Sequence, residues 1–425
     1  MTDAPQAPMG VRDVLRIRDY RYLFAGQVVS DIGDGITLLL VLLVIFELTG
    51  SNTALALMAI AEAVPAFSVG LVAGVYVDRW DRRRIMLAAD LLRAGIVLAF
   101  AFVQTAALLP LFYVLGFTQA SIATFFRPAR GAMLPHIVPA GGLPAANSLA
   151  QASQVIGNVI GAGLAGLIFG VFGSGIVGFA IDSATFVLSF LLISRISRSA
   201  GRIDRAPGDH QGQRVGASVL EGLRIVRGSR VLSGIVLAIG VTMLGLGAVN
   251  VLFVPLIIKD LAVSPTWMAG IDAAQTVGML GAAALVTTLA RRLAPTTIIT
   301  LGLVGIGVCI GLVSGVSAVW QVMLILLAVG LFVTPLQAMV QTLVQTSTGD
   351  ATRGRVVSVV QASMSTASVV SMAIGGVLGD IIGIREVFLA AGSFVLVAAA
   401  VSWVMFRGVS GRPSESRLVG ASDTA

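Results

Sequence analysis

The chain has 425 residues, of which 56% are hydrophobic and 12% are charged, and its mean hydropathy is +0.96. In soluble domains about a quarter of all residues are charged, so this composition excludes a protein that faces water on all sides. The single cysteine, Cys309, excludes an intramolecular disulfide, and His136 and His210 have no neighbours that would complete a metal site. We therefore expect neither a metal nor a cofactor.

Apolar runs of about twenty residues recur along the chain, which is the length that crosses about 30 Å of hydrocarbon. Backbone polar groups in lipid must be bonded within their own segment, so these runs are predicted to be helices. The predicted fold is an all-α membrane protein with twelve transmembrane helices. They cover residues 22–48, 54–77, 85–105, 108–126, 144–171, 175–194, 231–257, 267–289, 296–315, 318–342, 356–381 and 386–406.

The segments between these helices alternate in charge. One face holds 25 of the 28 Lys and Arg residues, the other holds Lys259 and Arg385, and Arg93 lies within a predicted helix. The positive-inside rule places the arginine-rich face and both termini in the cytoplasm. This explains the net charge of +7 without nucleic acid, and we expect a multi-pass protein of the inner (plasma) membrane.

The two halves of the chain repeat each other. Residues 151–153 and 361–363 both read Gln-Ala-Ser, and the same offset relates Gly166 to Gly376. Two parallel six-helix repeats form a transporter architecture. The predicted domains are a cytoplasmic N-terminus (1–21), a six-helix bundle (22–194), a cytoplasmic linker with an interfacial helix (195–230), a second six-helix bundle (231–406) and a cytoplasmic tail (407–425).

The joint between the second and third predicted helices reads GVYVDRWDRRR over residues 74–84. Asp78 ends a helix, where the helix dipole disfavours an anion, so it needs a positive partner that a conformational change can release. The alternative is a simple topology signal in which Asp81 caps the next helix.

This joint resembles the signature loop of the major facilitator superfamily, Gly-x3-Asp-Arg-x-Gly-Arg-Arg. Asp81 stands where the family has glycine. The resemblance implies that the loop gates the switch between inward-open and outward-open states. The residues that would carry this role are Gly74, Asp78, Arg79, Arg82 and Arg83.

Further segments resemble the macrolide-efflux and siderophore-exporter branch of that superfamily. They are FFRPARGAMLP at 125–135, AANSL at 145–149, SDIGD at 30–34 and EGLR at 221–224, within a resemblance that covers residues 12–406. The branch implies proton-driven export of amphipathic compounds. The family's antiporter motif Gly-Pro-x-x-Gly-Gly is only partly present at Gly157 and Gly161, and for these glycines we favour helix packing.

Ionisable residues within the predicted helices are functional candidates, because a charge in lipid is costly. Asp34 lies about twelve residues into the first helix, or about 18 Å at 1.5 Å per residue. Asp31 shares its face, and like charges this close disfavour ionisation of both, so one of them could carry a proton. Glu62 and Arg93 complete the proton-coupling candidates.

The partner of Arg93 is expected to be Asp34 or Asp90, and the alternative role is a static ion pair that fixes helix register. Asp182 and Asp272 are interpreted as solvated helix ends near the outer face, and the alternative role is that of coupling sites.

The second half carries uncharged polar residues on four predicted helices. Such groups among apolar neighbours suit a large amphipathic ligand. The alternative is hydrogen bonding between helices. The substrate-cavity candidates are Asn250, Gln275, Gln337, Gln341 and Gln361.

The sequence as a whole favours a secondary active transporter, since it has no phosphate-binding Gly-x4-Gly-Lys-Ser/Thr loop. We expect a monomer in the bilayer that exports a small amphipathic molecule by proton antiport through alternating access. The first alternative is an importer or facilitator of a nutrient, and the second is a non-transporting scaffold or sensor. No arrangement of nucleophile and base indicates an enzyme.

Overall fold

The computed structural model describes residues 9–77, 79–201, 215–348 and 350–407, and these are almost entirely helical, with no strand among them. Ten of the described helices are long and apolar enough to cross a membrane. Asp78 of the predicted gate and residues 202–214 of the predicted linker lie outside the described residues. The described part is therefore an all-α structure built for a bilayer.

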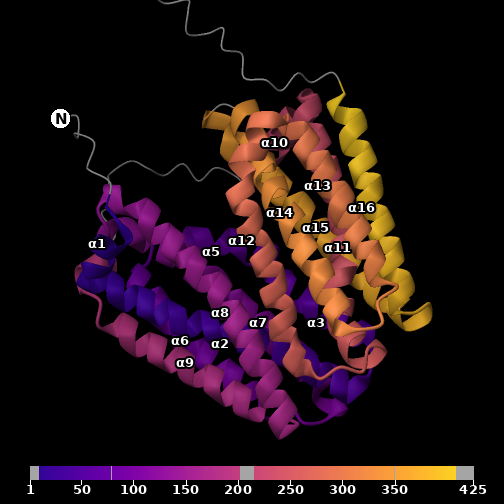
Figure 1. Cartoon of the computed structure of the whole chain (residues 1–425). Coiled ribbons are helices and arrows are strands. Elements are labelled where there is room, and N and C mark those ends of the chain that lie inside the picture. Colours follow the sequence, from indigo (N-terminus) through magenta and orange to yellow (C-terminus); the bar gives the residue numbers. More distant parts are fainter. Residues whose placement is uncertain (1–8, 78, 202–214, 349, 408–425) are drawn as a thin grey trace, which may run out of the picture.

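The helices before residue 202 lie together, from indigo to magenta in Figure 1. α2 packs against α8 and α9, and α6 packs against α7 and α9. This first group comprises α1 (Val11–Arg16), α2 (Arg18–Thr49), α3 (Asn52–Ala63), α4 (Pro65–Ser68), α5 (Gly70–Val77), α6 (Arg82–Phe100), η1 (Ala106–Leu108), α7 (Leu109–Ile137), η2 (Ala140–Gly142), α8 (Leu143–Phe172), α9 (Ile176–Ser194) and η3 (Arg198–Gly201).

The helices after residue 214 form a second group, from pink through orange to yellow in Figure 1. α11 packs against α15 and α16, while α13 packs against α14 and α16 and α12 packs against α14. The group comprises α10 (Val215–Gly228), α11 (Arg230–Pro255), the π-helical turn η4 (Leu256–Asp260), η5 (Pro265–Trp267), α12 (Met268–Arg292), α13 (Pro295–Val313), α14 (Val319–Ser347), α15 (Asp350–Ile381) and α16 (Ile384–Phe406).

Two predicted helices differ most from the structure. The continuous helix expected over 54–77 is wrong: the chain forms α3, α4 and α5, with interruptions at Val64 and Val69. Pro65 begins α4, and its ring removes a backbone donor from the helix. The end expected at residue 126 is also wrong, because α7 continues to Ile137. Its buried face continues through Phe126, Ala129 and Met133, at helical spacing.

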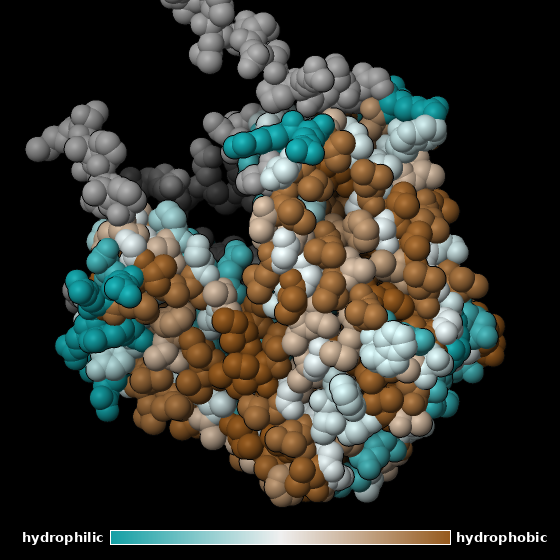
Figure 2. Space-filling view, viewed as in Figure 1, coloured by the Kyte–Doolittle hydropathy of each residue, from teal (hydrophilic) through white to brown (hydrophobic). Residues whose placement is uncertain are grey.

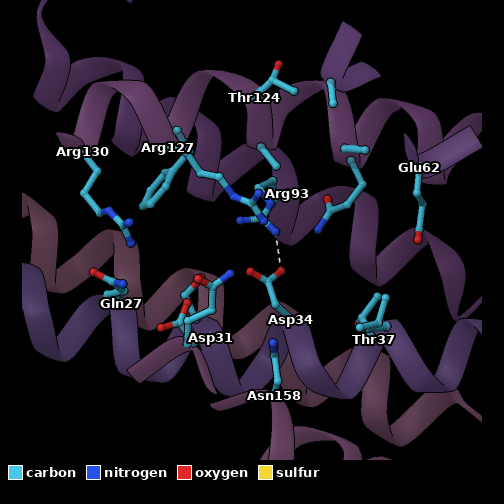
Figure 3. Close-up of a pocket in the computed structure, with 18 of the residues that line it drawn as sticks. Gln27, Asp31, Asp34, Thr37, Glu62, Arg93, Thr124, Arg127, Arg130 and Asn158 are labelled. Carbon is cyan, nitrogen blue, oxygen red and sulfur yellow. Dashed lines mark hydrogen bonds and ion pairs between the residues drawn. The ribbon is translucent and has the colours of Figure 1, made fainter. Parts of the chain in front are cut away.

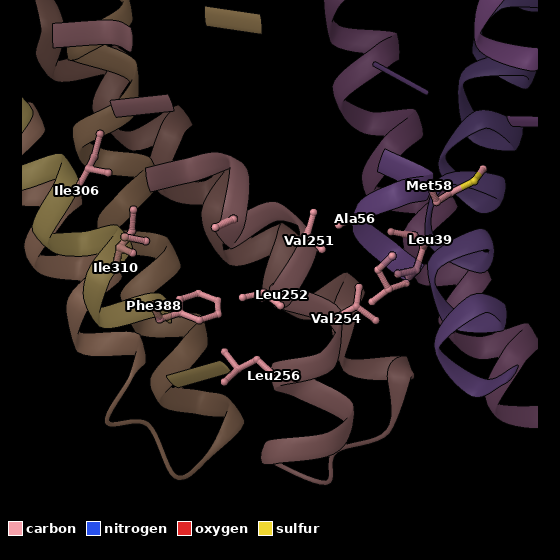
Figure 4. Packing of buried hydrophobic residues seen from close by; sticks show 14 of the residues in the cluster. Leu39, Ala56, Met58, Val251, Leu252, Val254, Leu256, Ile306, Ile310 and Phe388 are labelled. Carbon is pink, nitrogen blue, oxygen red and sulfur yellow. The ribbon is translucent and has the colours of Figure 1, made fainter. Parts of the chain in front are cut away.

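The two groups contact each other at one end, which we call the closed end and define by the joints at residues 50–51 and 382–383. α3 packs there against α15 and α11, and α8 packs against η5 and α12. Figure 4 shows buried apolar side chains of one cluster on both sides of this interface, with Leu39 and Ala56 on the side of the first group and Val251 and Val254 of α11 on the other. Burial of these side chains holds the groups together.

The outer surface agrees with a lipid environment. Figure 2 shows hydrophobic side chains over most of the visible face and hydrophilic side chains toward its edges. Phe102, Val171, Leu280 and Ile381 are each at least two-thirds exposed. Large apolar side chains in such numbers are stable against lipid and costly against water.

Candidate functional site

A cavity of about 420 Å³ lies among the helices of the first group. Its walls come from α2, α3, α4, α6, α7 and α8. Figure 3 shows the acidic residues Asp31 and Asp34 on one wall and basic residues on the facing wall. Six charged side chains line it, namely Asp31, Asp34, Glu62, Arg93, Arg127 and Arg130. All four residues that the sequence marked for proton coupling therefore share one cavity.

Asp34 and Arg93 form an ion pair across this cavity (Figure 3). The Arg93 side chain is 7% exposed and the Asp34 side chain is 39% exposed, so the acid is the member that water or a ligand can reach. The guanidinium also lies 4.2 Å from the ring centroid of Phe186, a cation–π contact that fixes its position. Of the two partners expected for Arg93, the structure selects Asp34.

Asp31 occupies the same wall one turn nearer the start of α2. The hydroxyl of Ser153 on α8 donates to its carboxylate at 2.6 Å. α8 can approach α2 this closely because Gly157 has no side chain. A Cβ at this position would lie only 2.7 Å from the Cβ of Asp31. Gly157 and Gly161 therefore pack α8 against α2, as favoured from the sequence.

Two further acids lie buried behind the cavity. The Thr37 hydroxyl donates to the Asp182 carboxylate at 2.6 Å, and Ser189 donates to Asp90 at 2.7 Å. Both acids are 0% exposed, so the expectation that Asp182 is a solvated helix end is wrong. Asp182 lies inside α9 and faces α2, where Gly33 leaves room for it.

Arg127 and Arg130 are site residues that the sequence interpretation placed in a cytoplasmic joint. They lie within α7 and line the cavity, opposite Gln27 and Asp31 (Figure 3). The apolar run stops at Phe126, which explains the error. The signal that identifies them is the buried helical face that continues past that residue.

The predicted gate residues other than Asp78, which lies outside the described residues, are at the end of the first group opposite the closed end. Arg83 donates to the carbonyl of Ser194 at 2.5 Å, at the C-terminus of α9, where the helix dipole favours a cation. Arg82 lies 2.7 Å from the His136 ring, and Asp81 caps α6 by accepting from the Arg84 backbone at 2.9 Å. Arg79 is exposed and Gly74 lies in α5.

The substrate-cavity candidates of the second half do not line this cavity. Asn250 of α11 and Gln361 of α15 are exposed, as are Gln337 and Gln341 of α14, while Gln275 of α12 is half-buried. Their role stays a prediction.

A model of the family described as transmembrane secretion effector matches residues 11–413. The chain belongs to the major facilitator superfamily. The resemblance seen in the sequence is thereby confirmed, and this major facilitator chain is an integral membrane transporter rather than an enzyme.

Two relatives of this major facilitator chain are efflux pumps by name. The multidrug efflux pump Tap of Mycobacterium tuberculosis is 29% identical over 370 residues, which cover 84% of this chain and 86% of Tap. Macrolide efflux protein A of Streptococcus pyogenes is 25% identical over 386 residues, which cover 89% of this chain and 94% of that protein.

A solved structure shows the same fold. It is that of a bacterial homologue of the iron transporter ferroportin in an inward-facing state, with a TM-score of 0.72 and 16% identity. The match covers 92% of this chain and 99% of that one. At this identity the likeness concerns the fold alone.

Proposed function

We propose that the protein exports a small amphipathic molecule from the cytoplasm by proton antiport, through alternating access of two six-helix bundles. The bundles would be residues 22–194 and 231–406, joined by 195–230. In this proposal α3, α4 and α5 make one crossing and α6 makes another. With the ten long apolar helices, they give twelve transmembrane segments.

The arginine-rich end of the molecule would face the cytoplasm, with both termini on that side of the inner membrane. Figure 2 shows a hollow between the two groups at the end where α1 and α10 lie. The closed end lies opposite. The structure would then be an inward-open state, in which the cavity receives substrate from the cytoplasm.

The observation that carries the proposal is the Asp34–Arg93 pair on the cavity wall. Protonation of Asp34 removes the charge that pairs with Arg93, and a ligand group held by the same carboxylate needs that charge. Proton binding and substrate binding therefore oppose each other, which is the thermodynamic requirement for antiport. A half-buried acid that a ligand can reach in a transport path is a typical proton carrier.

The loop between α5 and α6 would control the switch between the inward-open and outward-open states. Arg82 and Arg83 contact residues of their own group in this structure. In the outward-open state, we expect the loop residues Gly74, Asp78, Arg79, Arg82 and Arg83 to contact the second group instead and close the cytoplasmic side. Substrate would be bound by the cavity and by the polar residues of α11, α12, α14 and α15.

Export is favoured by the two efflux relatives. A specific observation favours the alternative, an importer or facilitator of a polar nutrient, because six charged groups line the cavity and a site for lipophilic drugs has only a few polar anchors. The direction of net flux separates the two functions.

Everted membrane vesicles test the proposal. They are energised and loaded with a pH-sensitive dye, and macrolides, other amphipathic antibiotics and siderophores are added one at a time. Export by antiport predicts that at least one compound collapses the proton gradient with the wild-type protein and not with Asp34→Asn. No response to any compound, with a folded protein that binds panel members, contradicts proton antiport.

A further inference from the structure

Arg127 and Arg130 lie one turn apart on α7 and share the face that lines the cavity. In the described part of the chain, the ion pairs involve other arginines, and neither Arg127 nor Arg130 has a hydrogen-bond partner. Arg130 is half-buried, so its guanidinium has lost part of its hydration without gaining a protein partner.

The acids of the cavity do not neutralise this pair. Asp34 is held by Arg93, and Asp31 accepts from Ser153 and acts on Arg130 only through space. Glu62 lies at the opposite end of the cavity (Figure 3). The end of the cavity near Arg127 and Arg130 therefore carries two unpaired positive charges against a single acid.

Topology alone would not require this placement, because a positive-inside signal needs only solvated arginines beyond the helix ends. Arg292 at the end of α12 is an example, since it is exposed and lies outside the cavity. A pair of guanidinium forks directed into a concave site is instead the arrangement that binds carboxylate or phosphate through paired hydrogen bonds.

We propose that Arg127 and Arg130 form a subsite for an oxyanion, so that the transported molecules include amphipathic acids and zwitterions with a carboxylate, sulfonate or phosphate group. The inference deepens the proposed export function and rests on it for its biological meaning. The cavity volume of about 420 Å³ suits a molecule of drug size. The anionic group would enter first from the hollow between the two groups of helices.

The same oxyanion chemistry occurs in a soluble cargo and in the headgroup of an anionic lipid. A binding assay in membranes of defined composition distinguishes these sources. We would place the protein in nanodiscs of phosphatidylcholine and titrate dansylglycine, which carries a carboxylate, against dansylglycinamide, which lacks it. Fluorescence anisotropy reports both affinities, and the titrations are repeated in discs that contain phosphatidylglycerol.

The expected result is that the wild-type protein binds dansylglycine about tenfold or more tightly than dansylglycinamide, as charge-assisted hydrogen bonds predict. The double variant Arg127→Gln/Arg130→Gln should lose this preference, the corresponding double lysine variant should keep part of it, and Arg292→Gln should keep all of it. Thermal unfolding of each variant confirms that it is folded.

Equal affinity of the wild-type protein for the two probes, or binding of neither, overturns the proposal, as does an undiminished preference in the double glutamine variant. A preference that disappears in phosphatidylglycerol discs assigns the subsite to a lipid headgroup and overturns the assignment to cargo. The assay requires no transport. A carboxylate preference without a response in everted vesicles would therefore contradict the export function and leave the subsite standing.

Discussion

Gly166 of α8 and Gly376 of α15 lie 210 residues apart in the sequence, and each packs at the closed end against a helical segment of the other group. A Cβ on Gly166 would lie 2.4 Å from the carbonyl oxygen of Pro265, and a Cβ on Gly376 would lie 2.4 Å from the Cβ of Ala56. The internal repeat thus places two equivalent close contacts where the halves meet.

Larger side chains at these positions should open the closed end. We expect Gly166→Leu and Gly376→Leu to lengthen the distance between spin labels at Val171 and Ile382, both of which are exposed. The reason is that backbone atoms opposite Gly166 cannot move aside cheaply. Gly240→Leu is the matched control, because nothing lies within 4 Å of its Cβ position. Unchanged distances in both variants would contradict this account of the interface.

A second contact at the closed end joins Asp380 of α15 to the start of α3. Its carboxylate accepts from the backbone nitrogens of Asn52 and Thr53, each at 2.9 Å, and from the hydroxyls of Ser51 and Thr53 at 3.0 and 2.7 Å. An anion at a helix N-terminus is favourable, and this one also bridges the two groups.

Removal of this carboxylate should favour opening. Asp380 is exposed, so after discounting for solvent we expect Asp380→Ala to shift the conformational equilibrium by about 1 kcal/mol, or about fivefold. The populations of short and long distances between the same spin labels give this value. Glu386→Ala removes an exposed acid at the same end and should leave the populations unchanged. If both variants behave alike, the effect is one of net charge.

Loss of Asp34 should destabilise the protein as well as uncouple it. Arg93 would remain buried without its ion-pair partner, and we expect Asp34→Asn to lower the free energy of unfolding by about 1–3 kcal/mol, less than for a fully buried pair because Asp34 is 39% exposed. Thermal unfolding in detergent measures the change. The double variant Asp34→Asn/Arg93→Gln should lose less than the sum of the single losses, and strict additivity would show that the pair is not coupled.

Because Thr37 donates a hydrogen bond to the buried Asp182, we expect substitutions of Thr37 to change the stability of the protein. Replacement by valine keeps the shape of the side chain and removes the hydroxyl that donates at 2.6 Å. We expect Thr37→Val to cost about 1–3 kcal/mol of stability, as for a buried acceptor that loses its partner. Thr37→Ser retains the hydroxyl and should stay close to wild type. Equal stability of all three proteins would mean that the bond from the Thr185 hydroxyl to the other carboxylate oxygen, at 2.9 Å, is sufficient for Asp182.

Hydropathy and the arginine pattern predict most of the helical segments, because the length of an apolar run and the distribution of Lys and Arg can be read from the sequence without any knowledge of tertiary contacts. The same signals failed where local rules override them. Pro65 interrupts a run that is largely apolar, and α7 continues past Phe126 because one of its faces stays buried. Hydropathy stays high across the break at Pro65, and it falls after Phe126 although the helix continues.

The candidate site was predicted in part. The cost of charge in lipid singled out Asp31, Asp34, Glu62 and Arg93, and the structure gathers them in one cavity. Which acid faces which base depends on helix rotation, and hydropathy does not determine it. For that reason Asp182 was assigned to a solvated helix end although it packs against α2.

The most direct test of the central claim uses purified protein in proteoliposomes with an imposed pH gradient. The cargo is the compound that gives the largest response in everted vesicles. Proton antiport predicts that an acidic lumen drives the wild-type protein to accumulate this compound above its external concentration, and that a protonophore or Asp34→Asn abolishes the accumulation. Uptake that stops at equal concentrations, or that is the same with and without the gradient, would contradict proton-coupled export and identify a facilitator.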